Sequence, residues 1–196
     1  MVELITGFGV EQDEKQNSSD EHIEQYLTFK VANELFAIGI LEVSEIIEFG
    51  SMTAIPMMPN FIRGVINLRG RAVPVVDLSA RLGKGQRALD GRSCIILVQI
   101  AGEQHSLPIG MLVDSVDEIV EIEQGGIHPP PAFGESVDTQ FIKAMARTNE
   151  LFFILLDIKH LLSYVGDIAA QHWETIATQH STAFSERSMT TSSNSE

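Results

Sequence analysis

Short runs of β-branched and aromatic residues, broken by glycine and proline, recur along most of the 196-residue chain and restrict its fold more than any other feature. Runs of this kind are typical of short β-strands. We expect strands at residues 26–31, 35–38, 93–100, 107–113, 116–122 and 151–156. A turn at Asn33-Glu34 joins the first two as a hairpin. Many short strands with few helices between them favour a barrel or a sandwich, hence an all-β fold with a few short helices.

The remaining ordered segments give mixed signals. The apolar residues of 41–49 fit neither the helical period nor the two-residue period of a strand, and they predict a short helix that runs into a strand. Residues 60–66 follow Pro59 and predict one helical turn. Residues 67–78 predict a strand interrupted by Gly70. Pro74 removes a ladder donor, so that strand lies on an edge, carries a bulge, or bends at a barrel corner.

Only the C-terminal segment gives a sustained helical period. Apolar residues from Leu161 to Ile176 fall on one face of a helix, which Asp157 can start. Gly166 weakens this helix by about 1 kcal/mol relative to alanine. We expect the helix to dock on the body of the protein through Trp173.

Composition sets the limits of the ordered domain and excludes several partners. Residues 1–24 hold seven acids and one base and predict a flexible acidic arm, and the Ser/Thr-rich residues 180–196 predict a disordered tail. The domain between them spans 25–179. A net charge of −14 repels phosphate backbones and anionic lipid, so we expect neither nucleic acid nor membrane insertion. The sequence shows no signal peptide and no apolar stretch long enough to span a membrane.

No catalytic or metal-binding constellation stands out. Cys94 lies within an apolar run, which predicts a buried and inert thiol. None of the six histidines has a metal-ligand spacing. The acids of residues 114–123 alternate with apolar residues and predict a strand with one solvated face rather than a calcium loop. We therefore expect no catalytic residue, no metal and no cofactor.

Charge is distributed unevenly along the chain. Residues 61–92 hold seven bases and two acids, whereas residues 103–123 hold six acids and no base. Such segregation can give the protein one basic and one acidic face, which favours oriented docking. The alternative is ordinary surface charge paired across the fold. Charge alone leaves both interpretations open.

One segment, RGVINLRGRAVPVVDL at residues 63–78, carries a recognisable motif. It resembles the signature of the CheW family, the coupling proteins of bacterial chemotaxis, in which a G-x-x-N-L-R-G block precedes P-V/I-V/I-D-L. The matching residues are Gly64, Asn67, Leu68, Arg69, Gly70, Pro74, Val75, Val76, Asp77 and Leu78. Residues 26–40, 41–47, 109–120 and 152–162 resemble other elements of the family.

The resemblance implies a fold of two interlocked five-stranded SH3-like β-barrels with a hydrophobic centre between them, followed by the C-terminal helix. It implies a non-enzymatic adaptor that couples chemoreceptors to a CheA-type histidine kinase. One surface is expected to bind the regulatory domain of the kinase, and another the cytoplasmic tip of a chemoreceptor (a methyl-accepting chemotaxis protein). The implied location is the cytoplasm, with recruitment to membrane-bound receptor arrays.

The resemblance also suggests residues for receptor binding. Arg69 is the foremost, since an arginine on a turn beside Gly70 can project from a barrel rim and pair with carboxylates or helix C-terminal carbonyls. Its alternative role is to pin the barrel corner. Val43 and Glu45 match positions tied to receptor coupling, although Val43 fits a core position equally well. Gly64 is expected to serve the backbone.

For kinase binding, we expect an exposed apolar patch on one barrel, because stable docking needs a dry centre. Ile38, Ile40 and Leu41 are the candidates, and sequence alone does not separate exposed from buried apolar residues.

Other functions remain open at this point. The chain could serve a non-flagellar chemosensory pathway controlling pili or second messengers, or bind one partner only. From a different class, an enzyme or ligand binder could use a cleft lined by Arg69, Asp77 and Asp114.

Overall fold

The computed structural model describes residues 23–101, 106–130, 139–148, 151–165 and 168. Eleven strands lie in these residues: β1 (Ile23–Val31), β2 (Glu34–Gly39), β3 (Val43–Glu48), β4 (Ile62–Leu68), β5 (Arg71–Asp77), β6 (Cys94–Ala101), β7 (Ser106–Val113), β8 (Ser115–Glu123), β9 (Ile127–His128), β10 (Ile142–Thr148) and β11 (Leu151–Leu156). The short helices in these residues are η1 (Ile40–Glu42), α1 (Leu78–Arg81), η2 (Gln124–Gly126) and η4 (Thr139–Phe141), and a further helix begins at residue 158. None of the helices in these residues is long and apolar enough to cross a membrane.

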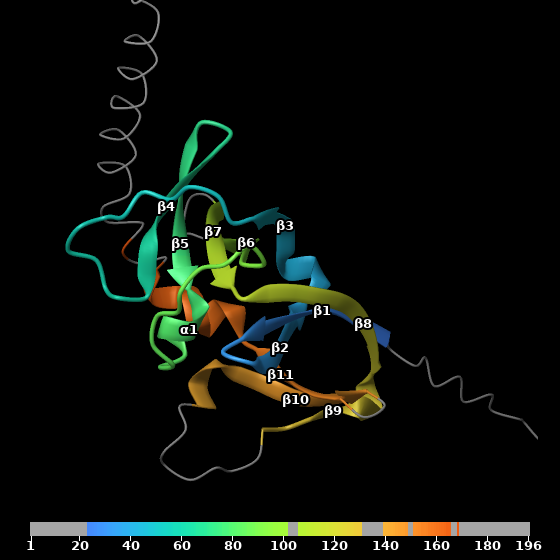
Figure 1. Ribbon diagram of the computed structural model, residues 1–196. Helices are drawn as coiled ribbons and strands as arrows, with labels where there is room; N and C mark the ends of the chain where they lie inside the picture. The colour runs from blue at the N-terminus through green and yellow to red at the C-terminus, as the bar shows by residue number, and fades with distance from the viewer. Residues whose placement is uncertain (1–22, 102–105, 131–138, 149–150, 166–167, 169–196) are drawn as a thin grey trace, which may run out of the picture.

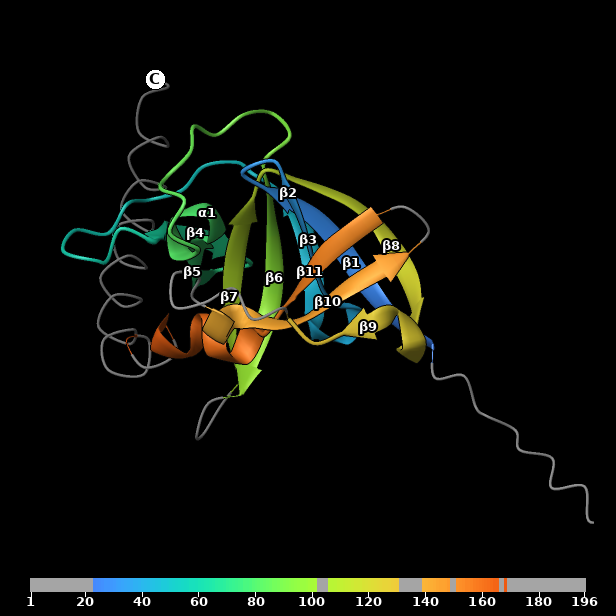
Figure 2. The ribbon, with the colours of Figure 1, turned by 90° about the horizontal axis from the view of Figure 1, so that it is seen from below.

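The strands form two sheets that divide the chain unequally. A six-stranded sheet has the order β8-β1-β2-β11-β10-β9, and a five-stranded sheet has the order β3-β6-β7-β5-β4. The first sheet therefore takes its strands from both ends of the described chain, and the second takes consecutive strands from the middle. Figures 1 and 2 show the two sheets on opposite sides of the molecule. The predicted all-β class with two units is confirmed.

Three apolar clusters hold this arrangement together. The largest lies between the sheets and contains residues of both, such as Leu27, Phe29 and Val76, together with the C-terminal helix residues Leu161 and Leu162. Two smaller clusters each belong to one sheet. The hydrophobic centre implied by the family resemblance is therefore present. β1 and β5 are buried on both faces along most of their length, so their apolar runs are nearly continuous, whereas β3 alternates between half-buried and exposed residues.

Most predicted elements are confirmed. Strands occupy all six of the predicted strand segments, and residues 41–49 form the end of η1 followed by β3. The first hairpin turns one residue earlier than expected, at Ala32 and Asn33, whose φ values are 53° and 66°. Two consecutive left-handed residues give the tight turn that matches the twist of a hairpin.

The predictions for residues 60–66 and 67–78 are wrong in detail. Residues 62–68 form β4 instead of a helical turn, because Ile62, Val65 and Ile66 bury their side chains while β4 pairs with β5. Residues 67–78 are not one strand but the end of β4, a turn and β5. β5 lies between β7 and β4, but its ladder with β7 includes only residues 75–77, so Pro74 has a ladder partner on the β4 side alone, as on a strand edge.

Other details needed the structure. The sequence did not indicate β9 or β10 as strands. Cys94 is half-buried rather than fully buried, and its Sγ lies 3.2 Å from the Arg92 carbonyl oxygen. β1 starts at Ile23, two residues inside the predicted acidic arm. The rest of that arm, the predicted tail and Trp173 lie outside the described residues.

The C-terminal helix begins where predicted. The Asp157 carboxylate accepts hydrogen bonds from the His160 backbone N–H at 3.0 Å and from the His160 Nδ1 at 2.8 Å. Burial opposes ionisation of Asp157, but these hydrogen bonds outweigh it and hold the pKa of the carboxyl below its usual range. The helix then buries Leu161, Leu162 and Val165 in the central cluster.

Gly64 is predicted to be irreplaceable for steric reasons. Its φ is +155°, and a Cβ there would lie 2.3 Å from the Thr53 carbonyl oxygen. Gly70 is also left-handed, at +82°, but a Cβ there would meet nothing within 4 Å. Gly64→Ala should lower the free energy of unfolding by about 3 kcal/mol, and Gly70→Ala by about 1 kcal/mol. Urea unfolding measures both, and equal losses would contradict the packing argument.

Asp157→Ala should lower the free energy of unfolding by about 1 kcal/mol at neutral pH, because it removes a helix N-cap. Asp157→Asn keeps a capping oxygen and serves as the control. The folded pKa of Asp157 lies below the unfolded value of about 3.9. The stabilisation is therefore present above the unfolded pKa and is lost as the pH falls through the folded pKa. Unfolding curves at neutral and acidic pH should show the gap between wild type and Asp157→Ala narrowing in acid; a constant gap would contradict this account.

Candidate functional site

The N-L-R-G motif forms the tip of the β4–β5 hairpin. Arg69 and Gly70 occupy the turn with φ values of 52° and 82°, so both are left-handed, as a type I′ hairpin turn requires. The Asn67 Oδ1 accepts a hydrogen bond from the Gly70 N–H at 2.9 Å. Leu68 and Arg71 lie opposite each other at the end of the ladder. The motif therefore holds Arg69 at the apex of a defined turn.

Two of the predicted receptor-binding residues meet at this tip. The Arg69 Nη2 lies 3.0 Å and 3.1 Å from the two carboxylate oxygens of Glu45. Glu45 belongs to β3, and β3 and β4 are the opposite edges of the five-stranded sheet. The ion pair therefore lies where the two edges of the curled sheet approach each other.

Exposure shows what this ion pair can do. The Arg69 side chain is 78% exposed and that of Glu45 is 35% exposed. An exposed ion pair contributes between 0 and about 1 kcal/mol, so pinning the barrel corner is a minor role for Arg69. Within the described residues Nη2 is the guanidinium nitrogen that has a partner, so the Nε and Nη1 donors are without one there. The arrangement can present an oriented guanidinium to a carboxylate or carbonyl of another molecule.

Val43 lies two residues before Glu45, at the start of β3. It is half-buried and packs against the central cluster. Val43 thus belongs partly to the core and partly to the surface.

The three kinase-binding candidates separate by burial. Ile38 is 1% exposed and belongs to the central cluster, so its side chain is not at the surface. Ile40 is half-buried against the same cluster, and Leu41 is 99% exposed on η1. The sequence also gave no sign that Phe152, on β11, is 61% exposed with the Arg147 guanidinium 5.2 Å from its ring centroid.

The basic segment does not form a free basic face. Six of its seven bases have partners within the chain. Five of them form ion pairs: Arg63–Asp77, Arg69–Glu45, Lys84–Glu34, Arg87–Asp114 and Arg92–Asp90. Arg81 donates to the Leu161 carbonyl oxygen at 2.8 Å and lies over the rings of Phe61 and Phe141. The alternative of charge paired across the fold is therefore correct for most of this segment.

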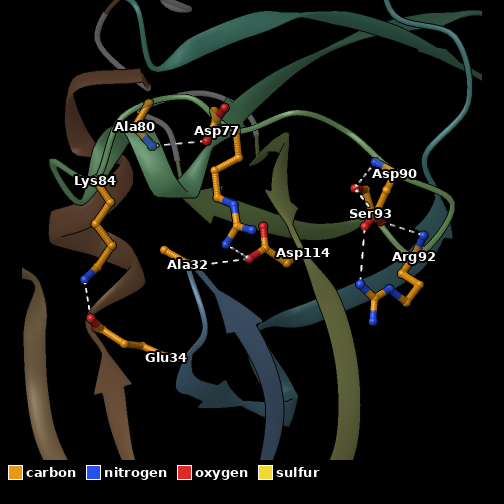
Figure 3. Close-up of polar contacts among 10 residues, drawn as sticks. Ala32, Glu34, Asp77, Ala80, Lys84, Asp90, Arg92, Ser93 and Asp114 are labelled. Atoms are coloured by element: carbon orange, nitrogen blue, oxygen red, sulfur yellow. Dashed lines mark hydrogen bonds and ion pairs between the residues drawn. The ribbon is translucent and has the colours of Figure 1, made fainter.

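Several of these contacts tie the two sheets together beside the first hairpin. Lys84, in the segment after α1, reaches Glu34 at the start of β2 (Figure 3). The Asp114 carboxylate, between β7 and β8, accepts hydrogen bonds from the Ala32 N–H and from Arg87, both at 2.8 Å. Asp114 therefore has a structural role, because its carboxylate joins the β1–β2 turn to the segment that follows α1. We call these contacts, together with the Lys84–Glu34 ion pair, the polar seam.

Asp77 also has a structural role. Its carboxylate accepts a hydrogen bond from the Ala80 N–H at 3.1 Å, which caps α1, and pairs with Arg63 at 3.2 Å. Burial raises the pKa of the Asp77 carboxyl, against the opposing effects of the Ala80 N–H and the Arg63 guanidinium.

The structure does not assemble the alternative ligand cleft. Arg69 precedes β5 and Asp77 ends it, so the seven-residue strand separates them. Asp77 and Asp114 are occupied by internal contacts. Among the residues that the structure describes, no group of three or more histidine, cysteine or acidic side chains could hold a metal ion.

A two-sheet β-protein with a fixed arginine at a hairpin tip is the class that this geometry defines. Comparison with known proteins gives its family: residues 25–165 match the family model of the CheW-like domain. The chain is 30% identical over 154 residues to the chemotaxis protein CheW of Klebsiella aerogenes, covering 76% of this chain and 90% of that protein. It is 28% identical over 140 residues to the protein FrzA of Myxococcus xanthus, covering 71% and 85%.

A solved structure agrees with these matches. The scaffolding protein TtCheW of Thermoanaerobacter tengcongensis superposes with a TM-score of 0.63 and 37% identity, covering 71% of this chain and 87% of that chain. The chain described here belongs to the CheW family.

The Arg69–Glu45 ion pair should contribute little to stability. We expect Arg69→Ala and Glu45→Ala each to lower the free energy of unfolding by less than about 1 kcal/mol, with a coupling energy of about 0.2–1 kcal/mol in the double-mutant cycle. Asn67→Ala is the contrast, because it leaves the Gly70 N–H without its hydrogen bond and should cost about 1 kcal/mol. Urea unfolding of the variants measures these values. A coupling energy well above 1 kcal/mol would make Arg69 a structural residue.

Proposed function

We propose that the protein is a non-enzymatic adaptor that couples chemoreceptors to a CheA-type histidine kinase in chemotaxis signalling. Membership of the CheW family supports this proposal, as do relatives that are named chemotaxis and scaffolding proteins. The observation that carries it is the exposed Arg69 guanidinium, which a rigid turn and Glu45 hold at the hairpin tip.

The hairpin tip is the proposed receptor site. A receptor tip is a helical hairpin, which offers surface carboxylates and carbonyl oxygens as acceptors. The guanidinium of Arg69 has free donors in a fixed plane and suits both. Because the Asn67 hydrogen bond and the left-handed turn fix the backbone beforehand, little ordering remains to oppose binding. Val43 and Glu45, on the neighbouring β3, complete the surface.

The proposed kinase site lies around η1. Leu41 offers a fully exposed apolar side chain, and Ile40 continues it toward the central cluster. An apolar anchor of this kind can supply the dry centre of an interface. Ile38 does not contact a partner in this proposal; it belongs to the central cluster. The charge of Arg69 is not part of this surface, so the two partners should respond to different substitutions.

The proposed location follows from the partners. An adaptor of this kind works in the cytoplasm and is recruited to membrane-bound receptor arrays through its receptor site. The net charge of −14 supports a protein that binds neither nucleic acid nor anionic lipid directly.

Titration calorimetry with a receptor-tip fragment and with the kinase regulatory domain tests the proposal. Wild type should bind both. Arg69→Glu should weaken receptor binding by at least about tenfold, since a charge-assisted hydrogen bond is worth about 1.5–3 kcal/mol, and leave kinase binding unchanged. Arg92→Glu is the matched control, because Arg92 is exposed and pairs only locally with Asp90.

Two results would overturn the proposal. Folded wild type that binds neither partner at micromolar concentration would remove the coupling function. Equal losses for Arg69→Glu and Arg92→Glu would remove the assigned receptor site.

A further inference from the structure

Arg71 is the exception among the bases of residues 61–92. The other six have a carboxylate or carbonyl partner within the chain. Arg71 is exposed, and no side-chain partner for it lies within the described part of the chain. Among the bases of residues 61–92, Arg71 is therefore the one whose side chain is available to another molecule within the described part of the chain, on a protein with a net charge of −14.

Arg71 occupies a defined position relative to Arg69. It begins β5 directly after the turn, opposite Leu68 in the ladder. Two residues along an extended backbone span about 7 Å, so the Cα atoms of Arg69 and Arg71 lie no farther apart than that. The Asn67–Gly70 hydrogen bond fixes the turn between them. The hairpin tip thus carries two arginines at a set separation, with Glu45 as counter-charge to one of them.

The charges give this tip a distinct electrostatic character. Two cations and one carboxylate leave it locally positive, while the chain as a whole is strongly acidic. A local positive site on such a surface attracts and orients carboxylates of a partner. Surface residues three or four apart on a helix have Cβ atoms about 5–6 Å apart, which is comparable to the spacing of the two arginines.

We propose that Arg71 is a second cation of the receptor site, and that the hairpin tip reads a pair of acidic side chains one turn apart on the partner helix. Arg69 engages one carboxylate while it remains held by Glu45, and Arg71 engages the other. This inference rests on the proposed function, because it takes the receptor helix as the partner. It adds a specificity rule: receptors with the acidic pair bind more tightly than those without it.

The test is a titration of receptor-tip fragments with wild type, Arg71→Gln and Arg71→Glu at two salt concentrations. Lys143→Gln is the matched control, since Lys143 is an exposed base on β10, in the other sheet. We expect Arg71→Gln to weaken receptor binding about threefold to tenfold, as for one charged pair at an interface rim, and to reduce its salt dependence. Arg71→Glu should weaken it further. Lys143→Gln and kinase binding should be unchanged.

A second arm changes the partner. Replacing the acidic pair of the receptor fragment by glutamine should weaken wild type and leave Arg71→Gln nearly unaffected. If Arg71→Gln binds as wild type with the same salt dependence, Arg71 is an ordinary solvated charge and the inference is wrong while the proposed function stands. If wild type binds no receptor fragment, the proposed function and this inference both fall.

Discussion

The apolar cluster between the two sheets is the interaction on which the rest of the structure depends. It takes side chains from both sheets and from the C-terminal helix, so neither sheet can bury its inner face without the other. β1 shows this most directly, because Tyr26 packs within the six-stranded sheet while Leu27 and Phe29 face the central cluster. Burial of this shared surface fixes the crossing at η1, where the chain passes from one sheet to the other and leaves Leu41 exposed. The surfaces available to partners are thus a consequence of how the centre is filled.

The charged residues then decide which part of the surface is free to bind. Most bases of the middle segment are used within the molecule, in the seam around Asp114 and in the cap formed by Asp77. Arg69 and Arg71 remain accessible at the β4–β5 tip, where turn geometry rather than burial holds Arg69. A hairpin turn that requires two left-handed residues costs the chain conformational energy, and the Asn67 hydrogen bond offsets part of that cost. The structural effect of the N-L-R-G motif is therefore to hold Arg69 at the apex of the β4–β5 turn.

Much of this could be predicted from the sequence, and the failures have physical causes. Period-two runs predicted the main strands, and the motif predicted a turn beside Gly70. The helical turn predicted for residues 60–66 was wrong, because the pairing of β4 with β5 outweighs the tendency of Pro59 to start a helical turn. β10 was missed because its alternation uses alanine and methionine, which carry little β propensity. The burial of Ile38 and the exposure of Leu41 could not be predicted, because β2 ends at Gly39 and the two-residue alternation of a strand does not continue into η1, to which Leu41 belongs. The sequence could not single out Arg71, because which bases of residues 61–92 pair with a carboxylate depends on the folded structure.

The central claim is that one molecule bridges two partners through separate surfaces. The most direct measurement is calorimetric titration of the protein into the kinase regulatory domain, first alone and then with the receptor-tip fragment present at saturation. The account predicts that the kinase domain binds with one-to-one stoichiometry in both titrations, so that a ternary complex forms. Loss of kinase binding when the receptor fragment is saturating would show that the partners compete for one surface, and would contradict the account.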